Sequence, residues 1–132
     1  MSWNYYVGDP CYVIDTKRWD EFCDKLFSHS NYNNNAPCDI KWEVDGVEYT
    51  IETWDSPGGD GVWRFNKGEC GVDAGLLAIV PRECCEERVL STHYGGILFN
   101  DLPTLETDKY NHWVEINGER DLDSDWRDND EY

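Results

Sequence analysis

The chain has 132 residues, a length that suits one domain. It carries 28 Asp and Glu against 11 Lys and Arg, which gives a formal net charge of −17. A field of this sign repels nucleic acid and anionic membranes and attracts basic proteins. We therefore expect a basic protein partner, with no direct contact to nucleic acid and no membrane association.

The N-terminus and the cysteines predict the compartment. Residues 1–6 lack the basic and apolar segments of a secretory signal, and no apolar run approaches the roughly 20 residues of a membrane span. The six Cys are therefore predicted to be free thiols in a reducing cytoplasm. Seven Trp, eight Tyr and four Phe are expected to supply much of the core.

The first elements are two short strands and the main helix. Residues 3–7 and 11–14 are predicted to be strands, because Gly8-Asp9-Pro10 between them is a turn signal. Residues 16–28 are predicted to be a helix whose apolar side chains form one stripe at helical spacing: Trp19, Phe22, Cys23, Leu26 and Phe27.

Residues 41–54 carry the clearest hairpin signal, with Asp45-Gly46 as a two-residue turn between alternating strands. This turn places Val44 opposite Val47, and Trp42 opposite Tyr49, on the inner face. The outer face then carries Glu43 directly opposite Glu48, a mildly destabilising pair of like charges. Glu52 and Trp54 continue that outer face.

The rest of the chain predicts further strands at 62–65, 70–73, 76–80, 92–99, 105–110 and 113–116. The run at 76–80 is predicted to be buried on both faces, and the strand at 92–99 to be interrupted by Gly95-Gly96. Residues 81–90 are either a short helix or an irregular excursion. Asn117-Gly118 is a second hairpin turn, which places Glu115 opposite Arg120. The predicted fold is an α+β domain of seven to nine mostly antiparallel strands, a meander or sandwich with the helix at about 16–28 packed on it.

The composition changes near residue 119. Residues 119–132 hold seven acids against two Arg, which predicts a globular domain at 1–118 followed by an acidic, mobile tail. Asp121, Asp123 and Asp125 resemble the opening of a calcium loop. The positions that need Gly and Glu hold Trp126 and Tyr132, so no specific calcium site is predicted.

No motif names a reaction. The close cysteines, Cys84 and Cys85, are adjacent and badly placed to chelate one zinc ion, and no serine lies in a nucleophile elbow. The chain is therefore predicted to be non-enzymatic, without metal or cofactor. An alternative is that Asp9, Asp60 and Asp73, each in a turn, converge as a cluster in a small-ligand or metal-dependent domain.

Three segments together carry a resemblance: residues 7–14 (VGDPCYVI) with Trp19 and Cys23, residues 57–61 (PGGDG) and residues 71–76 (GVDAGL). In this order they resemble small proteins of unknown function that phages and prophages encode, over roughly residues 5–80. The resemblance implies a viral or mobile-element origin, with a host cytosol as location. It carries over no catalytic residue.

These observations favour an acidic binding protein of phage origin, which could mimic nucleic acid and inhibit a basic host protein of defence or nucleic-acid handling. Phage-borne anti-restriction and anti-CRISPR proteins include acidic mimics of this kind. The alternatives are the small-ligand domain above and a structural or assembly protein of a virion. The sequence leaves the oligomeric state open. The predicted partner-binding residues are Glu43, Glu48, Glu52, Trp54, Asp121, Asp123, Asp125 and Trp126.

Overall fold

The computed structural model describes residues 3–32, 36–56, 61–86, 95–108 and 113–122. These residues form antiparallel sheets with one main α-helix packed against them, which confirms the predicted α+β class. They contain ten strands in three sheets, where the pattern predicted seven to nine.

Five strands form the central sheet, in the order β2–β3–β6–β1–β7, and all neighbours are antiparallel. Because β6 lies between β3 and β1, its residues 76–80 are buried on both faces, as the continuous apolar run predicts. The strands of this sheet are β1 (Tyr5–Gly8), β2 (Cys38–Val44), β3 (Val47–Asp55), β6 (Leu76–Pro81) and β7 (Ile97–Phe99).

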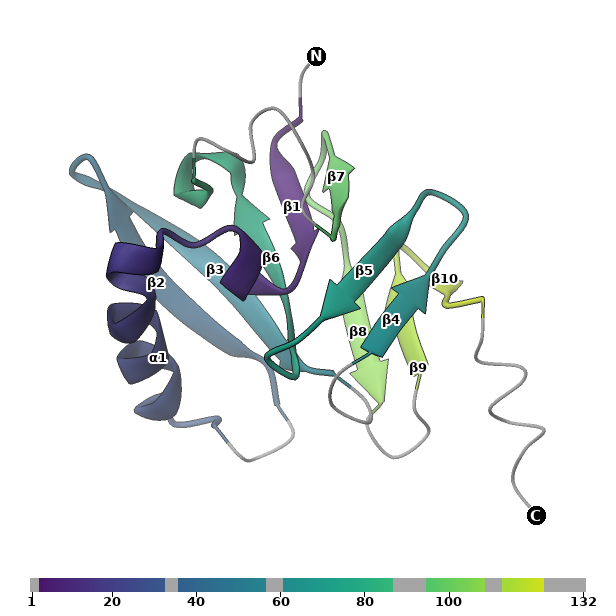
Figure 1. Ribbon diagram of the computed structural model, residues 1–132, viewed down its shortest axis with the longest axis horizontal. Coiled ribbons are helices and arrows are strands. Elements are labelled where there is room, and N and C mark those ends of the chain that lie inside the picture. The colour runs from purple at the N-terminus through teal and green to yellow at the C-terminus, as the bar shows by residue number, and fades with distance from the viewer. Residues whose placement is uncertain (1–2, 33–35, 57–60, 87–94, 109–112, 123–132) are drawn as a thin grey trace.

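The main helix covers one face of the central sheet (Figure 1). A short 3₁₀ helix, η2 (Thr16–Arg18), leads into α1 (Trp19–Phe27), so the predicted helix at 16–28 is confirmed. Asp15 accepts a hydrogen bond from the backbone N–H of Lys17 (2.9 Å) and caps this start. Phe22 packs edge-on against Trp42 of β2, with ring centroids 5.8 Å apart, at the centre of the first core.

The other face is covered by two smaller sheets, which enclose a second core. Figure 1 shows them on the far side of the central sheet from α1. One sheet pairs β4 (Gly61–Arg64) with β5 (Glu69–Val72), close to the strands predicted at 62–65 and 70–73. The other has the order β10–β9–β8, built from β8 (Leu105–Asp108), β9 (Trp113–Ile116) and β10 (Glu119–Arg120).

Both predicted two-residue turns are present. Asp45 and Gly46 join β2 to β3 with φ angles of 52° and 81°, the left-handed values that this hairpin turn needs. The register places Trp42 opposite Tyr49 and Glu43 opposite Glu48, as predicted. Asn117 and Gly118 join β9 to β10 with nearly the same angles, 53° and 82°.

Two sequence predictions need correction. The predicted strand at 11–14 is wrong, because η1 (Pro10–Tyr12) occupies this position. Asp9 caps it by accepting from the N–H of Cys11, and Pro10 supplies a fixed φ at its first position. The predicted strand at 92–99 is described from residue 95 on, and there only β7 is extended. A Cβ at Gly96 would clash with the ring of Tyr6.

The segment at 81–90 begins with η3 (Arg82–Cys84), and its residues 87–90 lie outside the described part. The boundary predicted at 118 falls inside the third sheet. Glu119 and Arg120 pair with β9, and Leu122 donates its backbone N–H to the carbonyl of Arg64 (2.7 Å). The folded part therefore continues through residue 122.

Candidate functional site

The outer face of the β2–β3 hairpin carries most of its charge as carboxylates. The register places Glu43 opposite Glu48, and also Asp39 opposite Glu52. Between these two like-charged pairs, Lys41 donates from Nζ to Oγ1 of Thr50 (3.1 Å). Facing like charges destabilise an antiparallel pair, so stability does not account for this pattern.

The two glutamates nearest the turn face solvent. Glu43 and Glu48 are both exposed, and neither forms an ion pair with another residue in the described ranges. A third like-charged pair, Glu106 opposite Glu115, occurs on β8–β9. There Arg120 compensates Glu115 at 3.2 Å. The uncompensated pair on the hairpin is therefore the stronger candidate for contact with a basic partner.

The other predicted hairpin residues are less available. Glu52 is half-buried, and Trp54 is half-buried because its ring packs against the second core. Asp39 accepts a hydrogen bond from His29 across 3.1 Å, and this contact lowers the pKa of the Asp39 carboxyl. Trp54 therefore has a structural role in the second core.

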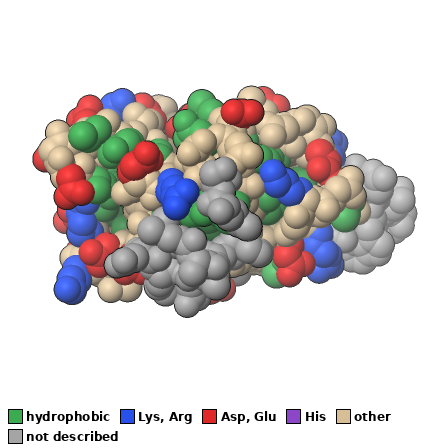
Figure 2. All heavy atoms as spheres, turned by 90° about the horizontal axis from the view of Figure 1, so that it is seen from above, with side chains coloured by type: hydrophobic (Ala, Val, Ile, Leu, Met, Phe, Trp, Pro, Cys, Tyr) green, Lys and Arg blue, Asp and Glu red, His purple; other side chains and the backbone are tan. Residues whose placement is uncertain are grey.

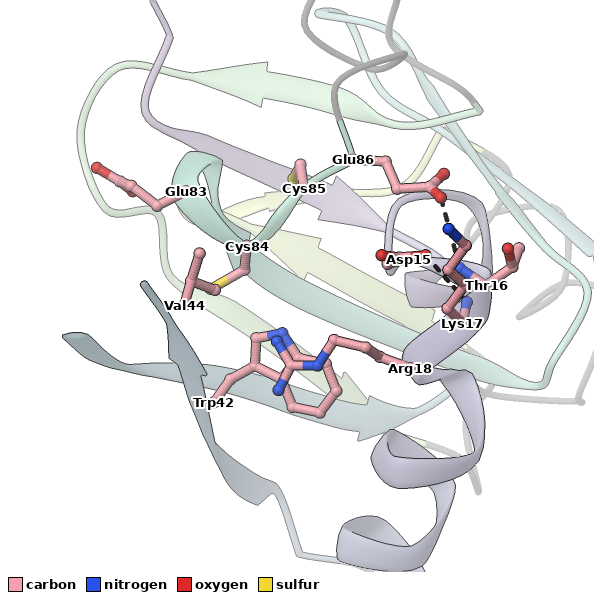
Figure 3. A pocket seen from close by; sticks show the side chains of 10 residues that line it. All are labelled: Asp15, Thr16, Lys17, Arg18, Trp42, Val44, Glu83, Cys84, Cys85 and Glu86. Carbon is pink, nitrogen blue, oxygen red and sulfur yellow. Dashed lines mark hydrogen bonds between the residues drawn. The ribbon is translucent and has the colours of Figure 1, made fainter. Parts of the chain in front are cut away.

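A hollow of about 490 Å³ lies beside the hairpin, between η2, η3 and the inner face of β2 (Figure 3). In it the guanidinium of Arg18 lies over the ring of Trp42, 3.9 Å from the centroid. Arg18 also donates to both carboxylate oxygens of Glu21 (2.9 Å each), which lowers the pKa of Glu21, and to the backbone carbonyl of Glu43 (2.8 Å). Arg18 is thus committed to joining the helix to the hairpin.

The same hollow contains the adjacent thiols of Cys84 and Cys85. Burial raises the pKa of Cys84 to about 12 and raises that of Cys85 further. Both are therefore neutral near pH 7, whereas a nucleophile or a metal ligand needs the thiolate. All six cysteines are free thiols.

A second hollow, of about 530 Å³, lies across η3 from the first. Glu83 borders both hollows. Three carboxylates and two tyrosine rings line the second, and no Lys or Arg is among its described lining residues. No local sequence pattern predicts this grouping, because its acids come from three distant segments: Glu52, Glu83 and Asp101.

Asp9 and Asp73 lie close together, but the carboxylate of Asp9 accepts hydrogen bonds from three backbone N–H groups. It is buried and accepts from the N–H of Cys11 (2.8 Å), of Asp73 (2.6 Å) and of Ala74 (2.7 Å). The hydroxyl of Tyr12 donates to the exposed Asp73 carboxylate, which raises the pKa of Tyr12 to about 12. Asp60, the third member of the predicted cluster, lies outside the described residues.

Asp121 is buried, unlike a partner-binding residue of a tail. Its carboxylate accepts from the N–H of Val114 (3.0 Å), and its own N–H donates to the carbonyl of Val114 (2.8 Å). Asp123, Asp125 and Trp126 lie outside the described residues.

Charge on the face seen in Figure 2 is interspersed, with Lys and Arg among the carboxylates of the described residues. Within the described ranges, no three His, Cys, Asp or Glu side chains are grouped to hold a metal ion. No helix in the same ranges has the length and apolar character of a membrane span.

Comparison with family models, curated proteins and solved structures finds no match to this chain.

Proposed function

We propose that this protein is a non-enzymatic binding protein that engages a basic protein partner through the outer face of the β2–β3 hairpin. The observation that carries the proposal is the exposed, uncompensated pair Glu43 and Glu48. Together with Asp39, Asp45 and Glu52 it gives the hairpin five carboxylates on its outer face and turn, against the single cation Lys41.

The second hollow supports the same proposal. Glu52 belongs both to the hairpin and to this hollow, so the hollow adjoins the outer face of the hairpin. A carboxylate-lined hollow with tyrosine walls suits the guanidinium or ammonium group of a partner's Arg or Lys, through charge and through contact with the ring faces.

Nucleic-acid mimicry is the more specific form of the proposal. Same-strand carboxylates on the outer face, Asp39 with Glu43 and Glu48 with Glu52, are four residues and therefore about 13.6 Å apart, close to four axial rises of about 3.4 Å between phosphates of one DNA strand. The face seen in Figure 2 carries Lys and Arg among its carboxylates, so we base this idea on the hairpin, where five carboxylates accompany one cation. The resemblance to phage and prophage proteins supports a partner from a host defence or nucleic-acid-handling system, in a reducing cytosol.

The test begins with capture of partners from a bacterial lysate at low and at high salt, followed by calorimetry with the purified partner. We expect affinity to fall steeply as salt rises, since salt screens exposed charges. The double variant Glu43→Gln/Glu48→Gln should bind at least about tenfold more weakly.

The matched control is Glu69→Gln/Glu106→Gln, which removes two exposed carboxylates from other sheets and should leave affinity within about threefold. Affinity that does not change between low and high salt would contradict the electrostatic mechanism. Release of bound DNA from the partner would separate mimicry from binding at another surface.

A further inference from the structure

The apolar stripe of α1 is wider than the sheet beneath it can cover. Phe22 and Leu26 are buried in the first core, whereas Trp19 and Cys23 are only half-buried. Phe27, which the helical pattern places on the same stripe, is 57% exposed. One side of the stripe therefore remains open, although burying it would favour stability.

The open side lines a hollow of about 160 Å³ between α1 and the adjoining ends of β3 and β6, which we call the α1 groove. Its walls include Cys23, Phe27 and Tyr32, together with Asp55 and Ala74. The rings of Phe27 and Tyr32 contact each other with centroids 5.1 Å apart. An apolar cavity of about 150 Å³ holds one benzene ring, so the groove has room for one bulky side chain.

The margin of the α1 groove is acidic. Asp20 and Asp24 are exposed on α1, and each lies three positions before a groove residue, Cys23 and Phe27, so helical geometry places both carboxylates beside the groove. Burial and these two carboxylates raise the pKa of Cys23. Asp55 adds a third carboxylate from the end of β3. No Lys or Arg is among the groove's described lining residues. Lys25 projects from the other side of α1, because two helical positions turn the side chain by about 200° from Cys23.

We propose that the α1 groove docks a bulky apolar side chain, Trp, Phe or Leu, that a partner presents between Lys or Arg residues. This inference rests on the proposed function in taking the partner to be basic, and it adds a contact away from the outer face of the hairpin. Surface charge chiefly speeds and orients association, whereas buried aromatic and aliphatic anchors supply most of the affinity. The acidic margin selects among apolar segments by repelling those that carry Asp or Glu.

The test is a titration of the ¹⁵N-labelled protein with short synthetic peptides, followed by amide chemical shifts. One peptide has a central Trp flanked by Lys and Arg, a second has Ala at the centre, and a third keeps the Trp but has Glu at the flanks. The amides of Cys23, Phe27 and Gly75 report on the α1 groove, and those of Glu43 and Glu48 report on the hairpin. One experiment thus reads the two surfaces separately.

We expect the Trp peptide with basic flanks to shift the groove amides and to bind at least about tenfold more tightly than either other peptide. Phe27→Ala removes the exposed wall, and Ala74→Phe fills the hollow. Each should weaken binding by about tenfold or more. Val62→Ala is the control, because Val62 is an exposed apolar residue on β4, on the far side of the central sheet from α1 (Figure 1). It should leave affinity unchanged.

Other outcomes overturn the inference in distinct ways. Shifts confined to the hairpin, with equal affinity for the Trp and Ala peptides, would agree with the proposed function and contradict docking in the α1 groove. Equal binding of the peptide with Glu flanks would show that the groove does not select a basic partner. Absence of shifts at both surfaces would count against both proposals. Groove shifts on dilution of the free protein would identify a second copy as the occupant.

Discussion

Asp9 shows how a single buried carboxylate can fix the path of two distant segments. It holds the start of η1 through Cys11 and the turn between β5 and β6 through Asp73 and Ala74. Three backbone donors depend on it, and each buried donor left without an acceptor costs about 1–3 kcal/mol. We therefore expect Asp9 to contribute strongly to the stability of the fold.

Replacement of Asp9 by Ala is expected to lower the free energy of unfolding by at least about 3 kcal/mol, because all three donors lose their acceptor. Urea denaturation measures the loss. Asp15→Ala is the matched control, since Asp15 accepts from one backbone N–H at an exposed helix start and should cost about 1 kcal/mol. Equal losses in the two variants would show that Asp9 is no more than an ordinary cap.

Cys70 links stability to alkaline pH. Its thiol is fully buried, lies 3.4 Å from the carbonyl oxygen of Val7, and has its pKa raised to about 12, chiefly by burial. An unfolded thiol ionises near pH 8.5. The folded state therefore holds the thiol proton of Cys70 more tightly than the unfolded state does. The resulting contribution of Cys70 to the free energy of unfolding is complete below about pH 8.5 and is lost as pH rises toward 12.

Between pH 7 and pH 10 we expect Cys70 to account for a loss of about 2 kcal/mol in the free energy of unfolding. Urea denaturation of the wild type and of Cys70→Ala at both pH values isolates this part, because the variant lacks the titrating group. The variant should be less stable at pH 7 and should lose less on going to pH 10. The same pH dependence in both proteins would exclude Cys70 as the cause.

Among the elements, the β2–β3 hairpin was the most predictable from sequence. Its turn, its register and its inner face all follow from Asp45-Gly46 and a period of two residues, which are local properties. The strand predicted at 11–14 failed for the opposite reason. There the backbone turns around the carboxylate of Asp9, which is itself fixed by residues more than sixty positions away.

Glu48→Lys is expected to stabilise the hairpin by about 0.2–1 kcal/mol, since it replaces a like-charged pair with Glu43 by an attractive one. Thermal or urea denaturation measures the change. Glu48→Gln is the control and should give a smaller gain, because it removes repulsion without adding attraction. A loss of stability in both variants would mean that Glu48 has a favourable role within the folded chain.

At the scale of the whole molecule, the central sheet is covered on both faces, and the third sheet, which covers one of them, extends to Arg120. Asp121 and Leu122 each bond to other strands, so the acidic composition that begins at 119 does not coincide with the end of the fold. Composition marks where charge accumulates, whereas backbone hydrogen bonds show that the folded part includes Asp121 and Leu122.

Two truncations test this boundary. A chain that ends at Gly118 loses β10 and leaves the backbone groups of Val114 without Asp121, so we expect a loss of about 2–4 kcal/mol. A chain that ends at Leu122 keeps these bonds and should change by less than about 0.5 kcal/mol. Denaturant midpoints of the two truncations and the full chain give the comparison. Equal stability of both truncations would place the boundary at 118 instead.

The sequence by itself determined the α+β class, the main helix, the two tight hairpin turns and the acidity, because these depend on residue type and on spacing along the chain. Only the tertiary structure decided that Asp9 is a buried acceptor and that Glu52, Glu83 and Asp101 line one hollow. It also decided which side of the α1 stripe stays open. Such features depend on which distant segments meet, and no local pattern encodes that.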